Sequence, residues 1–153
     1  MVLQKILDLV KDVEHEYFQH EHVHTSEDAA SIRGNDLSQA AKAIVLRGKK
    51  NGSRFYVQCV LQGHKKLNIK ELKKFFGFKK LGLATPEQVL EVTNCTIGSV
   101  PPFGHLFGLP VFVDEDLFTE KYIFFSAGTH NDSVKMKSQD YKEIVPCHVM
   151  KIS

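Results

Sequence analysis

The sequence lacks long apolar runs, a signal peptide, repeats and linkers, which would indicate a membrane, secreted or multi-domain protein. Among its 153 residues, no apolar stretch approaches the roughly 20 residues that a membrane-spanning helix needs. Residues 1–17 are apolar but carry acids and bases at helical spacing, unlike a signal peptide. No repeat, linker or low-complexity segment is present. We therefore expect one domain over residues 1–153, large enough to bury a core, and no membrane partner.

Cysteine is also scarce. Cys59, Cys95 and Cys147 are far apart and odd in number, so they form neither a disulfide framework nor a CxxC metal site. A reducing compartment suits such a chain, and we expect a cytoplasmic protein. The sequence has no GxSxG nucleophile elbow and no paired Cys/His arrangement. Cys95, three residues before Gly98, is typical of a small core residue.

The net charge, +2, is too small to indicate a nucleic-acid partner by itself. Its distribution is more informative, because lysines crowd the segment from Lys65 to Lys80, where Glu71 is the only acid. Within it, Lys70, Lys73 and Lys74 fall on one outward face of a predicted helix. This segment is either a phosphate-binding patch or the solvated face of that helix.

The most informative feature that is present is a lysine inside an apolar run. Residues 40–46, AAKAIVL, are typical of a short buried strand. Alternation places Lys42 on the same internal face as Ala40, Ile44 and Leu46. An ammonium group is costly to desolvate, so we predict that Lys42 acts on an anion or a carbonyl in a polar cleft. The alternative is a side chain that bends out into solvent at the strand end.

The remaining periodicity predicts helices and strands in alternation. Helices are expected over residues 2–18, from the capping Thr25 to Gly34, over 69–76 between Asn68 and Gly77, from Thr85-Pro86 onward, and over 138–144. Strands are expected over residues 21–24, 40–46, 54–61, 80–83, 111–113, 122–126, 134–137 and 148–152. The pattern predicts an α+β fold with one mixed, strongly curved, barrel-like sheet flanked by helices.

Two further segments could carry chemistry. Residues 98–104, GSVPPFG, are predicted to form a loop. Its two prolines restrict the backbone, and its two glycines allow conformations that other residues resist. Its exposed amides could hold a carbonyl oxygen or a ribose hydroxyl, and Phe103 could line a pocket or stack on an adenine; a plain crossover is the alternative. His130, which follows Ser126-Ala127-Gly128-Thr129, could exchange a proton near neutral pH or could be a polar surface residue.

A histidine cluster offers a third possibility. His20, His22 and His24 alternate, so on a strand their imidazoles would share one face. Such a face could bind a metal ion, or it could be the solvated side of an edge strand.

In their order along the chain, these segments resemble a known family. They are the strand lysine, Ala84-Thr85-Pro86-Glu87, the loop of residues 98–104, the PVFVDEDL segment of residues 110–117 and Ser126-Ala127-Gly128. The chain is similar to YbaK-type aminoacyl-tRNA deacylases, which are related to the editing domain inserted in bacterial prolyl-tRNA synthetase. The similarity covers about residues 20–152.

The resemblance implies hydrolysis of the ester that joins a wrong amino acid to tRNA, with no cofactor and no metal. It implies that Lys42, Gly98 and His130 are catalytic. The local positive charge makes Lys70, Lys73 and Lys74 candidate contacts to such a tRNA. The implied substrate-binding residues are Thr25, Ala43, Ser99, Val100, Pro101, Pro102, Phe103 and Gly128. The family usually has Thr or Asn where this chain has Ala43, so no substrate amino acid is transferred.

The resemblance also indicates partners and leaves two rivals open. Mischarged tRNA is the expected partner, and an aminoacyl-tRNA synthetase is the other candidate. One rival is a non-catalytic accessory module of the same fold that binds tRNA or a synthetase. The second is a metal-dependent hydrolase that uses the histidine cluster.

Overall fold

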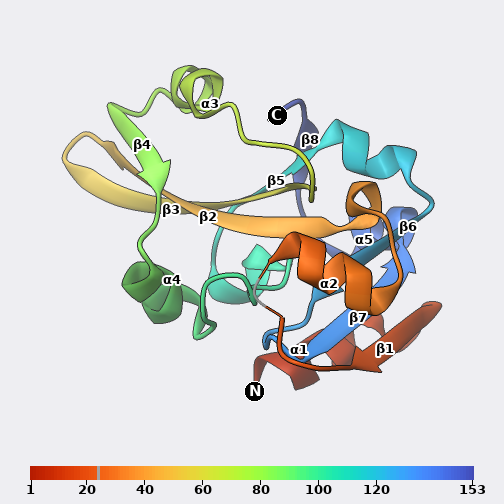
Figure 1. Cartoon of the computed structure of the whole chain (residues 1–153). Helices are drawn as coiled ribbons and strands as arrows, with labels where there is room; N and C mark the ends of the chain where they lie inside the picture. The colour runs from red at the N-terminus through yellow and green to blue at the C-terminus, as the bar shows by residue number, and fades with distance from the viewer. Residues whose placement is uncertain (24) are drawn as a thin grey trace.

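The computed structural model describes residues 1–23 and 25–153 (Figure 1). In chain order the elements are α1 (Val2–Val10), β1 (His15–Gln19), α2 (Ser26–Arg33), β2 (Ala41–Lys50), β3 (Ser53–Gln62), α3 (Ile69–Phe76), β4 (Lys80–Leu83), α4 (Pro86–Thr93), β5 (Val111–Asp114), β6 (Tyr122–Ser126), β7 (Asp132–Lys137), α5 (Ser138–Ile144) and β8 (His148–Met150). Short 3-10 turns lie at Leu37–Gln39, Gly104–Phe107 and Glu115–Thr119.

The predicted helix starts are confirmed, because each depends on neighbouring residues only. The Thr25 hydroxyl accepts a hydrogen bond from the amide of Asp28, 3.0 Å away, and caps α2. The Asn68 side chain caps α3 in the same way, and Gly77 ends that helix with a left-handed φ of 67°. Thr85 and Gln88 form a reciprocal capping box at α4.

The N-terminal segment differs from the prediction. The helix predicted over residues 2–18 is right only for its first part, since α1 spans Val2–Val10 and His15–Gln19 form β1 instead. These residues form a strand because they pair with the edge of β7, where Tyr17 lies opposite Val134. The strand predicted at residues 21–24 is not present in residues 21–23, and His24 lies outside the described residues.

The strands form two open sheets. The larger has the order β4-β2-β3-β5-β8 and the smaller has the order β1-β7-β6. Antiparallel β2–β3 pairing and parallel β3–β5 pairing confirm the mixed α+β class. The expected single barrel-like sheet is wrong: in the described residues the two sheets meet at one bridge, Ala40 to Phe124, which leaves both open.

Helices cover both faces of the larger sheet. Leu72 of α3 packs on Leu46 and Leu61 on one face, and Val89 of α4 packs near Val45 on the other. Figure 1 shows α3 and α4 on opposite sides of the β2–β3 hairpin. A further core fills the space between the two sheets. Within the described part of the chain, no helix is long and apolar enough to cross a membrane.

Candidate functional site

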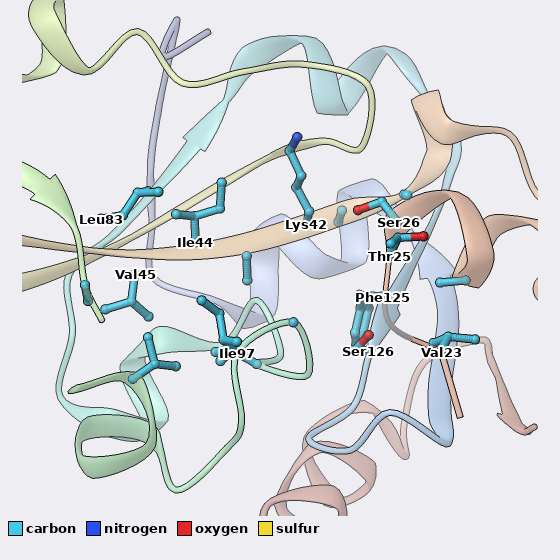
Figure 2. A pocket seen from close by; sticks show the side chains of 18 of the residues that line it. Val23, Thr25, Ser26, Lys42, Ile44, Val45, Leu83, Ile97, Phe125 and Ser126 are labelled. Carbon is cyan, nitrogen blue, oxygen red and sulfur yellow. The ribbon is translucent and has the colours of Figure 1, made fainter. Parts of the chain in front are cut away.

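A cavity of about 260 Å³ lies beside the first half of β2. The strand contributes residues 40–45, and α2 with the segment before it forms a second wall. Leu83 and the start of α4 form a third wall, and the loop that carries Gly98 closes the far side together with Ser126 of β6 (Figure 2). Segments that are far apart in the sequence therefore converge on one small space.

The cavity exists because one edge of β2 is left open. Strand β4 pairs only with the stretch from Leu46 to Lys49. At the other end of the strand, Ala40 bridges to Phe124. The edge between these contacts, residues 41–44, pairs with no described strand. Its outward backbone groups are available to a ligand, and they supply hydrogen bonding in a space whose side chains are mostly apolar.

The cavity walls are built from small side chains. Ala29 of α2 and Ala40, Ala41 and Ala43 of the strand region all line it. An alanine at each position leaves space where a larger residue would fill the cavity. Ala43, predicted from the resemblance to contact substrate, is one of these residues. The walls are therefore sized for a small group, such as the side chain of a small amino acid.

Lys42, the predicted site residue, lines this cavity at its edge. Figure 2 shows its side chain on the side of β2 that carries Ile44 and Leu83, opposite Ile97. Its ammonium donates to the carbonyl oxygen of Gly63, at 3.1 Å, and to that of Lys65. Burial lowers the pKa of Lys42, an effect that Glu27 opposes and Lys66 reinforces. An ammonium has three donors, so two are satisfied and one remains for an anion.

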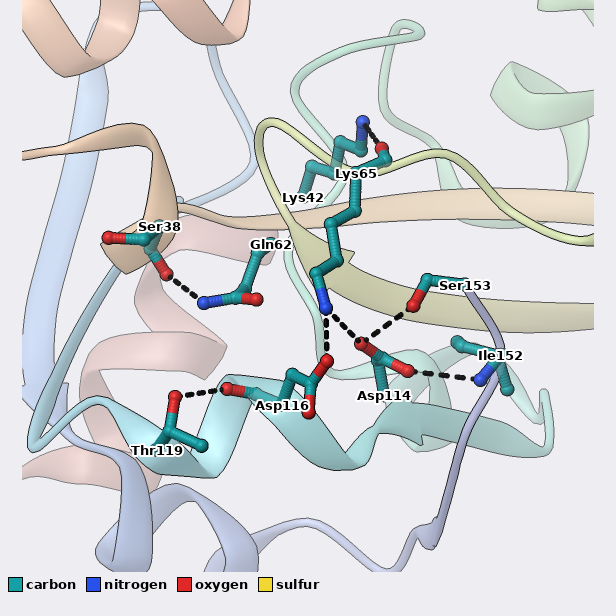
Figure 3. A network of polar contacts seen from close by, with 9 residues as sticks. All are labelled: Ser38, Lys42, Gln62, Lys65, Asp114, Asp116, Thr119, Ile152 and Ser153. Atoms are coloured by element: carbon teal, nitrogen blue, oxygen red, sulfur yellow. Dashed lines mark hydrogen bonds and ion pairs between the residues drawn. The ribbon is translucent and has the colours of Figure 1, made fainter.

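The loop that receives Lys42 is itself anchored on the other side (Figure 3). The Lys65 ammonium pairs with the Asp116 carboxylate and lies 3.8 Å from Asp114. Asp114 is fully buried and accepts a hydrogen bond from the amide of Ile152 at 3.0 Å. The hydrogen bond to Asp116 raises the pKa of Lys65. These contacts fix the position of Gly63 and Lys65, and with them the position of the Lys42 ammonium.

A second cation in the cavity wall was not predicted. Arg33 lies at the end of α2 and lines the cavity. Its Nε donates to Asn35 at 3.0 Å, its Nη1 donates to Ser133 at 3.4 Å, and burial lowers its pKa to about 10. No carboxylate of the described residues pairs with it. The available signal was its spacing, since Ser26, Ala29 and Arg33 fall on one helical face.

Hydroxyl groups supply most of the remaining side-chain polarity. Thr25, which was predicted, lines the cavity together with Ser26 and Ser126, which were not. In Figure 2 the Ser26 hydroxyl extends toward the Lys42 side of the space, and Ser126 lies on the opposite side of the strand. Such groups donate and accept hydrogen bonds, so a substrate hydroxyl could be recognised here.

Gly98 meets the cavity through its backbone. Both Gly98 and Val100 line the space. The Gly98 φ of 88° lies in the left-handed region, which other residues adopt only at a cost. Within the described residues, no acceptor receives the Gly98 amide N–H. An amide N–H left available at a cavity wall can donate to a carbonyl oxygen as negative charge develops on it.

The rest of the predicted loop faces inward. Ser99 is fully buried, and its hydroxyl donates to the carbonyl of Thr96 at 2.8 Å. The carbonyl oxygens of Pro101 and Pro102 accept from Gln58 at 2.9 Å and from Tyr141 at 2.5 Å. Phe103 is fully buried in the core against Phe125, so a role for Phe103 in a pocket or on an adenine is wrong. These four residues hold the loop in place and do not line the cavity.

His130 and Gly128 support the loop from behind. The Nε2 of His130 lies 2.8 Å from the Thr96 hydroxyl, which lies 3.2 Å from the Ser99 hydroxyl. The Gly128 amide donates to the carbonyl of Ser99 at 3.0 Å, and a Cβ at Gly128 would come within 2.9 Å of Val2. Neither residue lines the cavity. His130 therefore reaches the loop of residues 98–104 through Thr96 and Ser99.

The histidine cluster shows no ligand arrangement in the described residues. Nδ1 and Nε2 of His20 lie 2.7 Å from the Glu21 carbonyl and 2.8 Å from the Ser133 hydroxyl, respectively. The His22 ring packs on the His130 ring with centroids 4.6 Å apart. His24 lies outside the described residues, and no group of three potential metal ligands is found in the part of the chain that is described.

The predicted lysine patch is divided by the fold. Lys70, Lys73 and Lys74 are exposed on α3, outside the cavity. Lys65 is taken up by its pairing with Asp116. Lys65 is therefore set apart from the other six lysines of the segment, which are all exposed.

Comparisons with known proteins identify the family of the chain. Residues 20–144 match the family model of the aminoacyl-tRNA editing domain. The Multifunctional Ser/Thr-tRNA deacylase ProXp-y of Escherichia coli (strain K12) is 36% identical over 127 residues, which cover 82% of this chain and 75% of that protein. The proline--tRNA ligase of Thermosipho melanesiensis is 30% identical over 82 residues, covering 54% of this chain and 14% of the ligase.

A solved structure shows the same fold. A crystal structure described provisionally as a trans-editing enzyme for prolyl tRNA synthetase superimposes with a TM-score of 0.84, covering 99% of this chain and 96% of that one, at 23% identity. The family match, together with this fold, defines an aminoacyl-tRNA editing domain. This chain belongs to the aminoacyl-tRNA editing family. The family, the editing-hydrolase class and the α+β fold predicted from the sequence are confirmed.

Proposed function

We propose that this protein is a trans-editing hydrolase that cleaves the ester bond of mischarged aminoacyl-tRNA in the cytoplasm. The observation that carries the proposal is the small cavity between the Lys42 strand and the Gly98 loop. It places a held cation, an available amide N–H and a small apolar space within one site. The family membership of the chain supports the same reaction.

The substrate fits this site in one orientation. The amino-acid side chain enters the space walled by Ala29, Ala41 and Ala43. The ester carbonyl oxygen meets the amide of Gly98, and the terminal phosphate or the ester region meets the free donor of Lys42. His130 acts as a positioning residue, since it reaches the loop through Thr96 at 2.8 Å.

The chemistry needs little acid–base power, because an aminoacyl ester is already activated. Water attacks the carbonyl carbon, and negative charge grows on the carbonyl oxygen that the Gly98 amide stabilises. The bond between that carbon and the ribose oxygen then breaks. The ribose oxygen gains a proton, which the neighbouring ribose hydroxyl of the substrate can relay. The products are the free amino acid and a tRNA with its terminal hydroxyl restored.

Serine and threonine are the amino acids that the cavity favours. Thr25, Ser26 and Ser126 bring hydroxyls to its wall, and the alanines leave space for a side chain of that size. The Escherichia coli relative, named as a Ser/Thr-tRNA deacylase, supports this choice. Similarity to proline--tRNA ligases supports a synthetase as a second partner.

A deacylation screen tests the proposal. The protein is incubated with tRNAs that carry serine, threonine, alanine or a bulky amino acid such as leucine, and release of the labelled amino acid is followed. We expect release of serine and threonine and no release of leucine. Tight binding of tRNA with no release from any member of the panel would instead identify a non-catalytic accessory module. Turnover that a chelator abolishes and added metal restores would identify the metal-dependent rival.

A further inference from the structure

A second hollow, lined by cations, lies at the hairpin end of the larger sheet. Its walls are the side chains of Arg47, Lys49, Arg54 and Lys80, together with the chain around Gly82. All four cationic residues are exposed. None of them forms an ion pair with a carboxylate of the described residues. The hollow therefore has an uncompensated positive charge.

The strand register makes this arrangement specific. Lys49 lies directly opposite Arg54 on β3 and directly opposite Lys80 on β4, so three cations form a row across three neighbouring strands. Arg47 lies two residues before Lys49 on the same face. Like charges directly opposite each other destabilise a sheet. A row of this kind costs stability in the free protein, and a bound polyanion would remove that cost.

A glycine leaves space above this row. Gly82 lies opposite Arg47, and a Cβ at Gly82 would meet no atom within 4 Å. A larger side chain there would project into the hollow between the cations. At Gly82 the hollow is therefore lined by backbone alone. The open space opposite Arg47 can admit a phosphate group that the guanidinium binds.

The hollow adjoins the cavity along β4. Leu81 and Gly82 line the hollow, and the next two residues, Leu83 and Ala84, line the cavity. Leu83 lies opposite Leu46 and is 59% exposed on the other face of the sheet from the cations, so the two spaces adjoin along the β4 backbone. In Figure 1, β4 leads from the hairpin end of the sheet toward α4, which borders the cavity. A chain whose end occupies the cavity can therefore continue over β4 into the hollow.

We infer that the hollow formed by Arg47, Lys49, Arg54 and Lys80 binds backbone phosphates of the tRNA whose charged end occupies the cavity. The inference rests on the proposed function for its ligand. It places the main RNA contact on the face of the sheet opposite α3, since Arg47 and Lys49 alternate with Leu46, which packs against α3. Because Lys42 lies on the α3 face with Ile44 and Leu46, the RNA crosses the open edge of β2 to reach the hollow. This path does not require Lys70, Lys73 or Lys74 of α3.

Two variants of equal charge test the inference. The hairpin variant carries Arg47→Gln, Lys49→Gln and Lys80→Gln, and the α3 variant carries Lys70→Gln, Lys73→Gln and Lys74→Gln. Binding of deacylated Escherichia coli tRNA is measured over a range of salt concentrations. Each phosphate contact contributes about 0.7 to 0.9 to the slope of log affinity against log salt. The hairpin variant should lose about 2 to 3 units of that slope, and the α3 variant should keep it.

Controls separate the possible outcomes. The hairpin variant should melt at or above the wild-type temperature in low salt without RNA, because opposed like charges are removed. Should the triple variant fail to fold, Lys49→Gln alone, at the centre of the row, should reduce the slope by about 1. A wild-type slope in the hairpin variant, or a loss in the α3 variant alone, would overturn the inference. So would binding of polyglutamate to the hairpin cations more tightly than tRNA of equal charge, because that result identifies an acidic protein partner.

The same experiment distinguishes failure of the inference from failure of the proposed function. Deacylated tRNA binds without any chemical step, so the difference in its salt slope between wild type and the hairpin variant reports on the hollow and not on hydrolysis. A wild-type protein that releases no amino acid but binds tRNA through the hairpin would refute the hydrolase and leave the phosphate site standing. If the wild-type protein releases serine and the hairpin variant keeps the wild-type salt slope, the phosphate site is refuted and the hydrolase stands.

Discussion

The ammonium of Lys42 lies 3.1 Å from the carbonyl oxygen of Gly63, so the cation at the cavity edge is held by the loop that follows β3. That loop is fixed in turn by the pairing of Lys65 with Asp116. A lysine in a buried strand usually needs a carboxylate partner. Here backbone carbonyls satisfy two donors without cancelling the charge, which keeps the ammonium available to a phosphate or an ester oxygen.

Replacement of Lys42 by alanine should abolish deacylation and leave the fold intact. The cation is lost, while the carbonyls of Gly63 and Lys65 can be rehydrated at the edge of the protein, so the free energy of unfolding should fall by only about 1 kcal/mol. Lys50→Ala is the matched control, because Lys50 lies at the far end of the same strand and donates to the carbonyl of Phe76 at 3.4 Å. Single-turnover deacylation and thermal melts are measured for both. Near-wild-type turnover by folded Lys42→Ala would remove Lys42 from the mechanism.

Replacement of Gly98 by alanine should lower turnover more than tRNA affinity. A φ of 88° is unfavourable for any residue with a Cβ, so the backbone shifts at this position. The amide N–H then no longer points toward the ester carbonyl oxygen. Loss of one such donor costs about a hundredfold in turnover. Gly108→Ala is the control, since Gly108 has a comparable φ of 72° and lies outside the cavity. Equal turnover by the two variants would show that the Gly98 loop is only a crossover.

Replacement of Ala43 by valine should reduce hydrolysis of threonyl-tRNA more than that of seryl-tRNA. The added methyl groups narrow the cavity, and threonine exceeds serine by one methyl group. A difference of this size is worth about 1–3 kcal/mol, or roughly tenfold and more in the ratio of kcat/KM. Ala43→Gly, which widens the same wall, should move the ratio in the opposite direction. An unchanged ratio in both variants would place the amino-acid side chain elsewhere.

The buried thiol of Cys59 should make the protein lose stability at alkaline pH. Burial raises the pKa of Cys59 from 9.0 to about 12. Above pH 9 the thiol of the unfolded chain ionises, while the native thiol stays protonated. The free energy of unfolding is therefore unaffected by titration of Cys59 below pH 9 and falls as the pH rises toward 12. The loss is at most about 1.4 kcal/mol per pH unit. Urea unfolding of wild type and Cys59→Ala from pH 8 to 11 should show a shallower decline in the variant. Parallel declines would mean that Cys59 does not titrate on unfolding.

Local signals predicted much of the fold. The caps at Thr25, Asn68 and Thr85 depend on hydrogen bonds to amides three residues away, so neighbouring residues suffice to place them. Residues 15–18 form a strand in place of the predicted helix, and this change has the opposite origin. Their apolar spacing suits a helix, but β7, more than a hundred residues later in the chain, offers an edge to pair with.

The sequence alone determined the family, the α+β class and the two segments that frame the site, the strand of Lys42 and the loop of Gly98. These follow from short patterns whose residue types carry the chemistry. Only the tertiary structure decided that Phe103 turns into the core, that Arg33 enters the cavity wall and that Arg47, Lys49, Arg54 and Lys80 share one hollow. Packing between distant segments decides which way a loop side chain points and which strands lie side by side. No local sequence pattern contains that information.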